Sequence, residues 1–134
     1  MENSLLKKLV IKAGSRILVL NAPPGYVEKL LPLPEGTQLL TEATGTFDFG
    51  LAFVTNRAQV DESAPLMLSA VQPKGVLWFA YPKRGKGIET DINRDNGWDV
   101  MREAGWRGIA NVAIDETWSA LRFKPLTDIA TRSR

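Results

Sequence analysis

The stretch RILVLNAPPGYVEKLL, residues 16–31, decides the fold of this chain. Its first part, RILVLNA, is a continuous apolar run, typical of a strand that is buried on both faces of a parallel sheet. The second part has the apolar spacing of a helix, which the prolines that follow bring to an end. The turn between them, Asn21–Tyr26, lies where many α/β proteins hold a nucleotide-like ligand.

The chain continues this alternation of strands and helices. The pattern predicts a leading helix over residues 5–10, a short strand over 37–43, and two longer strands over 47–55 and 75–82. Between the two longer strands it predicts a helix that starts near Ser63, with Pro65 either in its first turn or at a kink.

The last third of the chain predicts a helix and a hairpin. The helix falls within residues 90–105, with Asp91, Asp95 or Asn96 as its N-cap and Gly105 as its C-terminal stop. Its predicted inner face consists of Trp98, Met101 and Ala104. Two strands, 109–114 and 118–123, follow and are joined by a short turn, which predicts an antiparallel pair.

Strands that alternate with helices favour a parallel sheet with helices on both faces. We therefore predict an α/β fold: a compact, reduced Rossmann-like three-layer sandwich with a mostly parallel sheet and an antiparallel C-terminal hairpin. Residues 1–134 are predicted to form a single domain, in which segments 1–8 and 127–134 are peripheral.

Composition excludes several functional classes. The chain has no cysteine and no histidine, which removes disulfides, thiolate catalysis, Cys-ligated zinc and the commonest general base. Its longest apolar runs are too short to span a bilayer, and its first residues lack the pattern of a secretion signal, so we predict a cytoplasmic protein with no membrane partner. A net charge of only +2 does not favour nucleic-acid binding.

Ligands of open α/β sheets bind beyond the carboxyl ends of the strands. The candidate ligand-binding residues are those at or just beyond the carboxyl ends of predicted strands, namely Asn21, Gly25, Tyr26, Glu42, Asn56, Tyr81, Lys83 and Arg84. At the first turn, the amides of Gly25 and Tyr26 are candidates to hold an anion. The alternative is a rigid turn that the packing of Tyr26 closes.

The charged clusters have structural as well as functional interpretations. The basic loop 83–87 is either an anion clamp or a solvated loop, and it lacks the spacing of a Walker motif. Asp91, Asp95 and Asp99 are better explained by the helix dipole than by a metal ion, so we predict no metal site and no catalytic residue. If Trp118 points inward, so does Arg122, which then needs a partner such as Asp48 or Asp115.

Four segments carry a family resemblance: IKAGSRILVLNAPPGY, FDFGLAFVTN, VQPKGVLWFAYPK and TWSALRF. Together they resemble a bacterial family of small α/β proteins of unknown function, over about residues 5–126. More distantly, the order of elements is similar to that of the S-adenosylmethionine-dependent methyltransferases. That second resemblance implies a cofactor near Asn21, Glu42 and Asn56, with Glu42 in the place of the carboxylate that holds the ribose.

The first turn departs from the methyltransferase pattern. Methyltransferases have an acidic residue and several glycines there, whereas this chain has Asn21, two prolines and the single glycine Gly25. The prolines remove two backbone donors and fix φ, which disfavours S-adenosylmethionine as a ligand.

Three hypotheses of function follow. The first is a non-enzymatic binding or regulatory domain with a small anionic ligand at the strand ends. One form of this hypothesis has the domain act as a homodimer. The second is a methyltransferase-like enzyme or its degenerate relic. The third, contact of the basic loop with nucleic acid, is the least favoured because the net charge is small.

Overall fold

The computed structural model describes residues 4–31, 33–85 and 87–126. Pro32, Lys86 and the predicted peripheral segment 127–134 lie outside these residues. The described strands form a six-stranded sheet in the order β2-β1-β3-β4-β6-β5. The strands are β1 (Arg16–Leu20), β2 (Gln38–Leu40), β3 (Phe47–Phe53), β4 (Val71–Pro82), β5 (Trp106–Ala113) and β6 (Trp118–Pro125).

The sheet confirms the predicted mixture of parallel and antiparallel pairing. Strand β1 runs parallel to both β2 and β3, and β3 runs parallel to β4. Strand β6 is antiparallel to both β4 and β5, which makes β5 and β6 the expected C-terminal hairpin.

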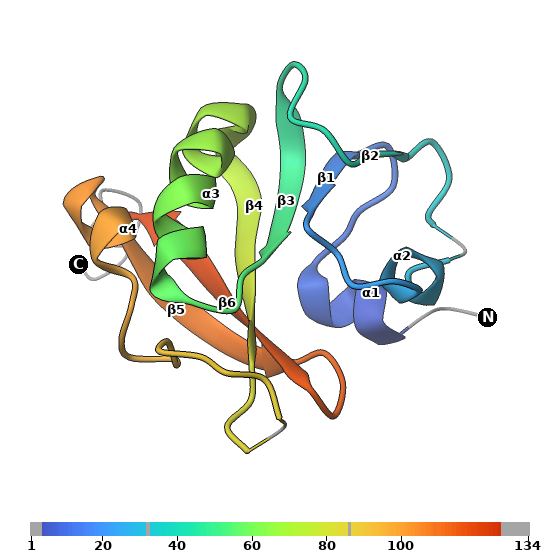
Figure 1. Ribbon diagram of the computed structural model, residues 1–134. Helices are drawn as coiled ribbons and strands as arrows, with labels where there is room; N and C mark the ends of the chain where they lie inside the picture. Colours follow the sequence, from blue (N-terminus) through green and yellow to red (C-terminus); the bar gives the residue numbers. More distant parts are fainter. Residues whose placement is uncertain (1–3, 32, 86, 127–134) are drawn as a thin grey trace.

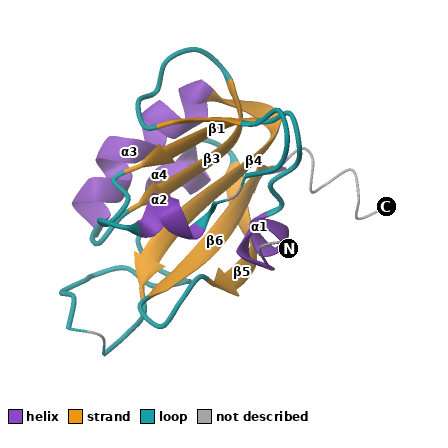
Figure 2. Cartoon of the chain, turned by 90° about the vertical axis from the view of Figure 1, so that its right-hand side faces the viewer, coloured by secondary structure: helices purple, strands orange, loops and turns teal. Residues whose placement is uncertain are grey.

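Helices cover both faces of the sheet, as a three-layer sandwich requires. Helices α1 (Ser4–Leu9) and α2 (Tyr26–Lys29) lie on one face, and α3 (Arg57–Ala70) and α4 (Asp99–Glu103) lie on the other (Figure 1). Figure 2 views the sheet from the side that carries α1 and α2. The predicted α/β Rossmann-like fold is therefore confirmed.

Each face of the sheet has its own apolar cluster. Val60, Ala64 and Met67 of α3 pack with Leu77 and Phe79 on one face. On the other face, Leu9 and Tyr26 pack with Phe49, Leu51 and Trp78. Each fully buried side chain of this kind contributes about 1.5–3 kcal/mol to folding, so the two clusters hold the layers together.

The N-terminal helix takes part in this packing. Leu6 and Leu9 of α1 are buried, and the Leu9 carbonyl accepts a hydrogen bond of 2.9 Å from the indole nitrogen of Trp78. The predicted peripheral segment 1–8 thus contributes Leu6 to the core.

Helix α3 starts earlier than the sequence predicts. It begins at Arg57, because the side chain of Asn56 caps it by accepting a hydrogen bond of 2.9 Å from the Gln59 amide. Ser63, the predicted cap, is a buried residue inside the helix. Pro65 also lies inside the helix, with its ring exposed to solvent.

Helix α4 is shorter than predicted, and none of the three predicted caps begins it. It starts at Asp99, after a loop in which the Asn93 side chain accepts hydrogen bonds from the amides of Asp95 and Asn96. These contacts favour a turn over a helix. Gly105 follows the helix with φ of +86°, as expected of a stop, but Ala104 is exposed rather than inward.

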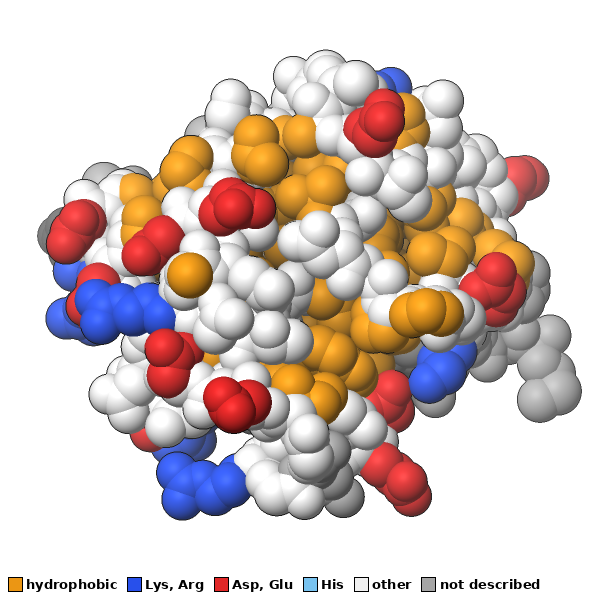
Figure 3. Space-filling model, in the orientation of Figure 1, with side chains coloured by type: hydrophobic (Ala, Val, Ile, Leu, Met, Phe, Trp, Pro, Cys, Tyr) orange, Lys and Arg blue, Asp and Glu red, His pale blue; other side chains and the backbone are white. Residues whose placement is uncertain are grey.

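The surface in the orientation of Figure 1 divides by chemistry. Apolar side chains reach the surface across the middle of this face, and acidic and basic side chains gather at its left-hand side and lower edge (Figure 3). Among the described residues, no helix is long and apolar enough to cross a membrane.

Candidate functional site

The switch point of the sheet lies between β1 and β3. From β1 the chain proceeds to β2 on one side and then returns to β3 on the other, so the carboxyl ends of β1 and β3 form the crevice in which open sheets bind ligands. Asn21 follows β1 with φ of +59°, and its side-chain amide donates a hydrogen bond of 3.4 Å to the Phe53 carbonyl at the end of β3. The predicted residues Asn21 and Asn56 therefore both lie at this edge of the sheet.

The turn after β1 is filled by a side chain. Tyr26 is only 2% exposed, and its ring packs edge-on against Phe53 with 4.6 Å between ring centroids. Phe53 packs in turn on Trp118 at 5.0 Å. The Tyr26 amide, a candidate anion donor, instead donates a hydrogen bond of 3.0 Å to the Pro23 carbonyl. The Tyr26 ring therefore closes the side of the turn that faces Phe53, as in the alternative interpretation, and a small cavity of about 200 Å³ remains between Pro23, Pro24 and the β5–β6 hairpin.

The hydroxyl group of Tyr26 is unusual. It is buried and has no hydrogen-bond partner among the described residues. Burial, with a smaller effect from the charge of Asp115, raises the pKa of Tyr26 well above its ordinary value of 10.0. The phenol therefore stays neutral at any physiological pH.

Asp115 ties this turn to the C-terminal hairpin. One of its carboxylate oxygens accepts hydrogen bonds of 2.8 Å from the amides of Thr117 and Trp118, and the other lies 3.2 Å from the Lys29 ammonium nitrogen. Burial alone would raise the pKa of Asp115, but these amides and Lys29 outweigh it and lower the pKa. Asp48, the other partner predicted for Arg122, accepts a hydrogen bond from the Arg16 amide.

The N-terminus of α3 is also occupied by the protein itself. The Asn56 side chain caps the Gln59 amide, and the Asp91 carboxylate accepts a hydrogen bond of 2.7 Å from the Arg57 amide. The positive end of the helix dipole is thus matched by an internal carboxylate. Asn56 acts here as a cap.

Glu42 lies apart from these contacts. It follows the end of β2, is exposed, and its backbone carbonyl accepts a hydrogen bond of 2.9 Å from the Thr44 amide in a tight turn. The side chains of Asn21 and Asn56 form their hydrogen bonds with Phe53 and Gln59 instead of with Glu42.

A cavity of about 560 Å³ opens at the carboxyl end of β4. It brings together three of the predicted residues, Tyr81, Lys83 and Arg84. Ser119 and Arg94 also line it, and sequence reasoning missed both. The signal for Ser119 is the register of β6 against β4, in which it lies directly opposite Tyr81.

The charges of this cavity favour an anion. Neither the Lys83 ammonium nor the Arg84 guanidinium has a carboxylate partner within the described ranges 4–31, 33–85 and 87–126. The Tyr81 hydroxyl donates a hydrogen bond of 2.6 Å to the Asn111 side chain, and burial raises the pKa of Tyr81 above 10.0, so this group remains a neutral phenol. The lining therefore has three cations, of which Arg94 is paired with Asp95, and one carboxylate, Asp91, which accepts a hydrogen bond from the Arg57 amide. The hydroxyls of Tyr81 and Ser119 complete the polar groups of the site.

Comparison with solved structures identifies proteins that share this fold. A methyltransferase dependent on S-adenosylmethionine from Aquifex aeolicus matches with a TM-score of 0.58 and 14% identity, over 90% of this chain and 87% of that chain. A ribosomal protein L11 methylase from Lactobacillus delbrueckii subsp. bulgaricus has a TM-score of 0.58 and 10% identity, over 91% and 75%. TrmN from Thermus thermophilus has a TM-score of 0.61 and 11% identity, over 92% of this chain but only 47% of TrmN.

These similarities are structural, and they show the fold alone. No protein-family profile and no curated protein sequence matches the chain. Membership of the bacterial family of unknown function therefore stays a prediction, whereas the distant resemblance to the methyltransferase fold is confirmed.

S-adenosylmethionine, which this fold implies, does not fit the turn after β1. The ring of Tyr26 fills the space beside Phe53, and its amide is used within the turn. Pro23 and Pro24 have no N–H group to offer. The turn thus lacks the open, donor-rich backbone that a nucleotide-like cofactor needs.

Proposed function

We propose that this chain is a degenerate relic of the methyltransferase fold, which binds a small anionic ligand at the carboxyl end of β4. The observation that carries the proposal is the cavity of about 560 Å³ in which Lys83 and Arg84 stand without carboxylate partners among the described residues. Arg offers a planar fork to an oxyanion, and Lys offers a compact charge.

Two further observations support the proposal. The fold similarity accounts for the scaffold and for a ligand site at this edge of the sheet. At the turn after β1, Tyr26 occupies the space beside Phe53. This packing favours the end of β4 over that turn as the position of the ligand site. The volume lies within the range of about 300–1,000 Å³ that is typical of small-molecule sites.

Calorimetric titration with inorganic phosphate tests this proposal. We expect saturable binding, which the double variant Lys83→Gln/Arg84→Gln weakens about tenfold or more, because each cation contributes charge-assisted hydrogen bonds. The matched control is Lys8→Gln/Lys12→Gln, which removes the same charge from exposed positions in α1 and its following loop. Equal weakening in both double variants would overturn the proposal, because it would point to non-specific charge.

The second candidate function is methyl transfer from S-adenosylmethionine, which the fold similarity favours. Titration with S-adenosylmethionine distinguishes this second function from the proposed degenerate relic. We expect no saturable binding. Binding that Asn21→Asp strengthened and Glu42→Ala abolished would support an active methyltransferase instead of a degenerate relic.

A further inference from the structure

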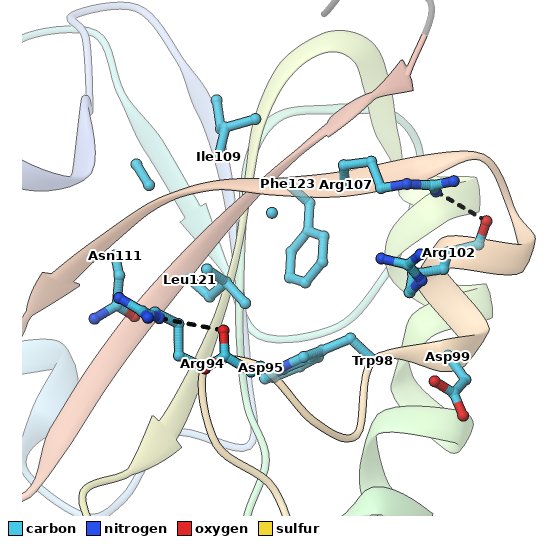
Figure 4. Close-up of a pocket in the computed structure, with 12 residues that line it drawn as sticks. Arg94, Asp95, Trp98, Asp99, Arg102, Arg107, Ile109, Asn111, Leu121 and Phe123 are labelled. Atoms are coloured by element: carbon cyan, nitrogen blue, oxygen red, sulfur yellow. Dashed lines mark hydrogen bonds and ion pairs between the residues drawn. The ribbon is translucent and has the colours of Figure 1, made fainter.

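A second cavity, of about 410 Å³, lies on the face of the sheet that carries α4. Its walls come from α4 and the loop before it and from the strand pair β5–β6 (Figure 4). None of the eight residues that the sequence singled out as ligand-binding lines this cavity. Its lining has one residue, Arg94, in common with that of the cavity at the end of β4.

The floor of the second cavity is apolar. Trp98 and Phe123 pack with ring centroids 5.4 Å apart, and Leu121 lies beside them in the same buried cluster. Gly108 of β5 keeps this floor open, since a Cβ atom there would lie 3.1 Å from the Leu121 side chain. An apolar body can rest on this surface with a favourable loss of water contact.

The acidic side chains of the cavity are already paired. Asp95 lies 3.4 Å from the Arg94 guanidinium, and Asp99 pairs with Arg57 of α3. The two other arginines of the lining, Arg102 of α4 and Arg107 of β5, therefore determine the net charge of the cavity.

Arg102 and Arg107 lie on the same side of the cavity in Figure 4. One nitrogen of Arg107 donates hydrogen bonds to the backbone carbonyls of Arg102 and Trp106, at 3.1 and 2.9 Å. In the part of the chain that the structure describes, neither guanidinium has a carboxylate partner. Two like charges on one side of a cavity repel each other unless an anion lies between them.

We propose that this cavity binds a phosphomonoester with a small apolar body. The guanidinium groups of Arg102 and Arg107 hold the phosphate, because two planar forks match its several terminal oxygens better than they match the two oxygens of a carboxylate. The apolar body rests on Leu121 and Phe123 beneath Gly108. This assignment stands independently of the ligand at the end of β4.

Phenyl phosphate is a suitable probe, and the titrations are made in the Lys83→Gln/Arg84→Gln background, so that any binding at the end of β4 is already weakened. We expect saturable binding that Arg102→Gln and Arg107→Gln each lower about tenfold or more. Arg107→Lys keeps the charge but loses the fork, so we expect a smaller loss. Circular dichroism of each variant checks that the fold is retained.

Gly108→Ala tests the apolar part of the site. The added methyl group narrows the space above Leu121, so we expect it to weaken phenyl phosphate and to leave inorganic phosphate unchanged. Absence of phenyl phosphate binding in this background, or binding that Arg102→Gln leaves intact, would overturn the assignment. The proposal for the end of β4 would survive either result, since its own test uses Lys83 and Arg84.

Discussion

The turn after β1 and the end of β4 lie at the same edge of one sheet, on either side of β3, yet they differ in chemistry. The first is filled by Tyr26, which is 2% exposed and whose amide donates a hydrogen bond to the Pro23 carbonyl within the turn. The second opens into a cavity lined by Lys83 and Arg84. Fold position shows where a ligand can bind, whereas the local residues decide whether there is space and charge for it.

The largest effect is expected from emptying the closed turn. Tyr26→Ala removes the buried aromatic ring through which α2 packs on Phe53, so we expect a loss of about 3–5 kcal/mol in the free energy of unfolding. Urea unfolding measures this loss. A change as small as that of a surface substitution would mean that the turn is not closed by this ring.

Asp115→Ala is expected to cost less, about 1–2 kcal/mol at neutral pH, because the carboxylate accepts hydrogen bonds from two backbone amides as a helix cap does. The folded state lowers the pKa of Asp115 below its ordinary value of 3.8. Its stabilising effect is therefore present above that ordinary value and is lost as the pH falls through the lower folded value.

Unfolding of both proteins across the acid range checks the sign of this effect. The wild type should approach Asp115→Ala in stability as the pH falls below about 4. A difference that persisted unchanged into strong acid would contradict the role assigned to the ionised carboxylate.

Tyr26→Phe should act in the opposite direction. The buried hydroxyl has no partner among the described residues, and a buried polar group without one costs about 1–3 kcal/mol. We expect the variant to gain up to about 1 kcal/mol, seen as a higher urea midpoint with an unchanged slope. A clear loss of stability would reveal a partner for the hydroxyl.

The smallest effect on stability is expected at the open site. Lys83→Gln/Arg84→Gln changes side chains whose charges have no carboxylate partner within the described segments, so the free energy of unfolding should stay within about 0.5 kcal/mol of wild type. The same urea titration measures it. A large loss would assign these two residues to the fold instead of to a ligand.

The sequence predicts the strands of the sheet, because their apolar runs stand out from the segments around them. It also predicts that Tyr81, Lys83 and Arg84 belong together, since they lie at the carboxyl end of one strand. It fails where an asparagine side chain makes a local hydrogen bond to the backbone that competes with the predicted pattern. Asn56 starts α3 ahead of Pro65, and Asn93 turns the chain where a helix was predicted.

The site beyond those three residues could not be predicted for a different reason, because it depends on how separate elements pack together. Arg102 and Arg107 lie on different elements, and only the packing of α4 against β5 brings them to one cavity. The pairing of Lys29 with Asp115 spans 86 positions of sequence and has no local signal.

The C-terminal hairpin has a consequence for the time course of folding. Among the strands of the described sheet, β5 and β6 are neighbours joined by a short turn, while β1 must meet β3 across a long intervening segment. Local pairing closes a small loop and is fast, whereas distant parallel pairing is slow. We expect amide protection to appear first in β5–β6 during refolding, and only later in β1, whose carboxyl end forms the switch point.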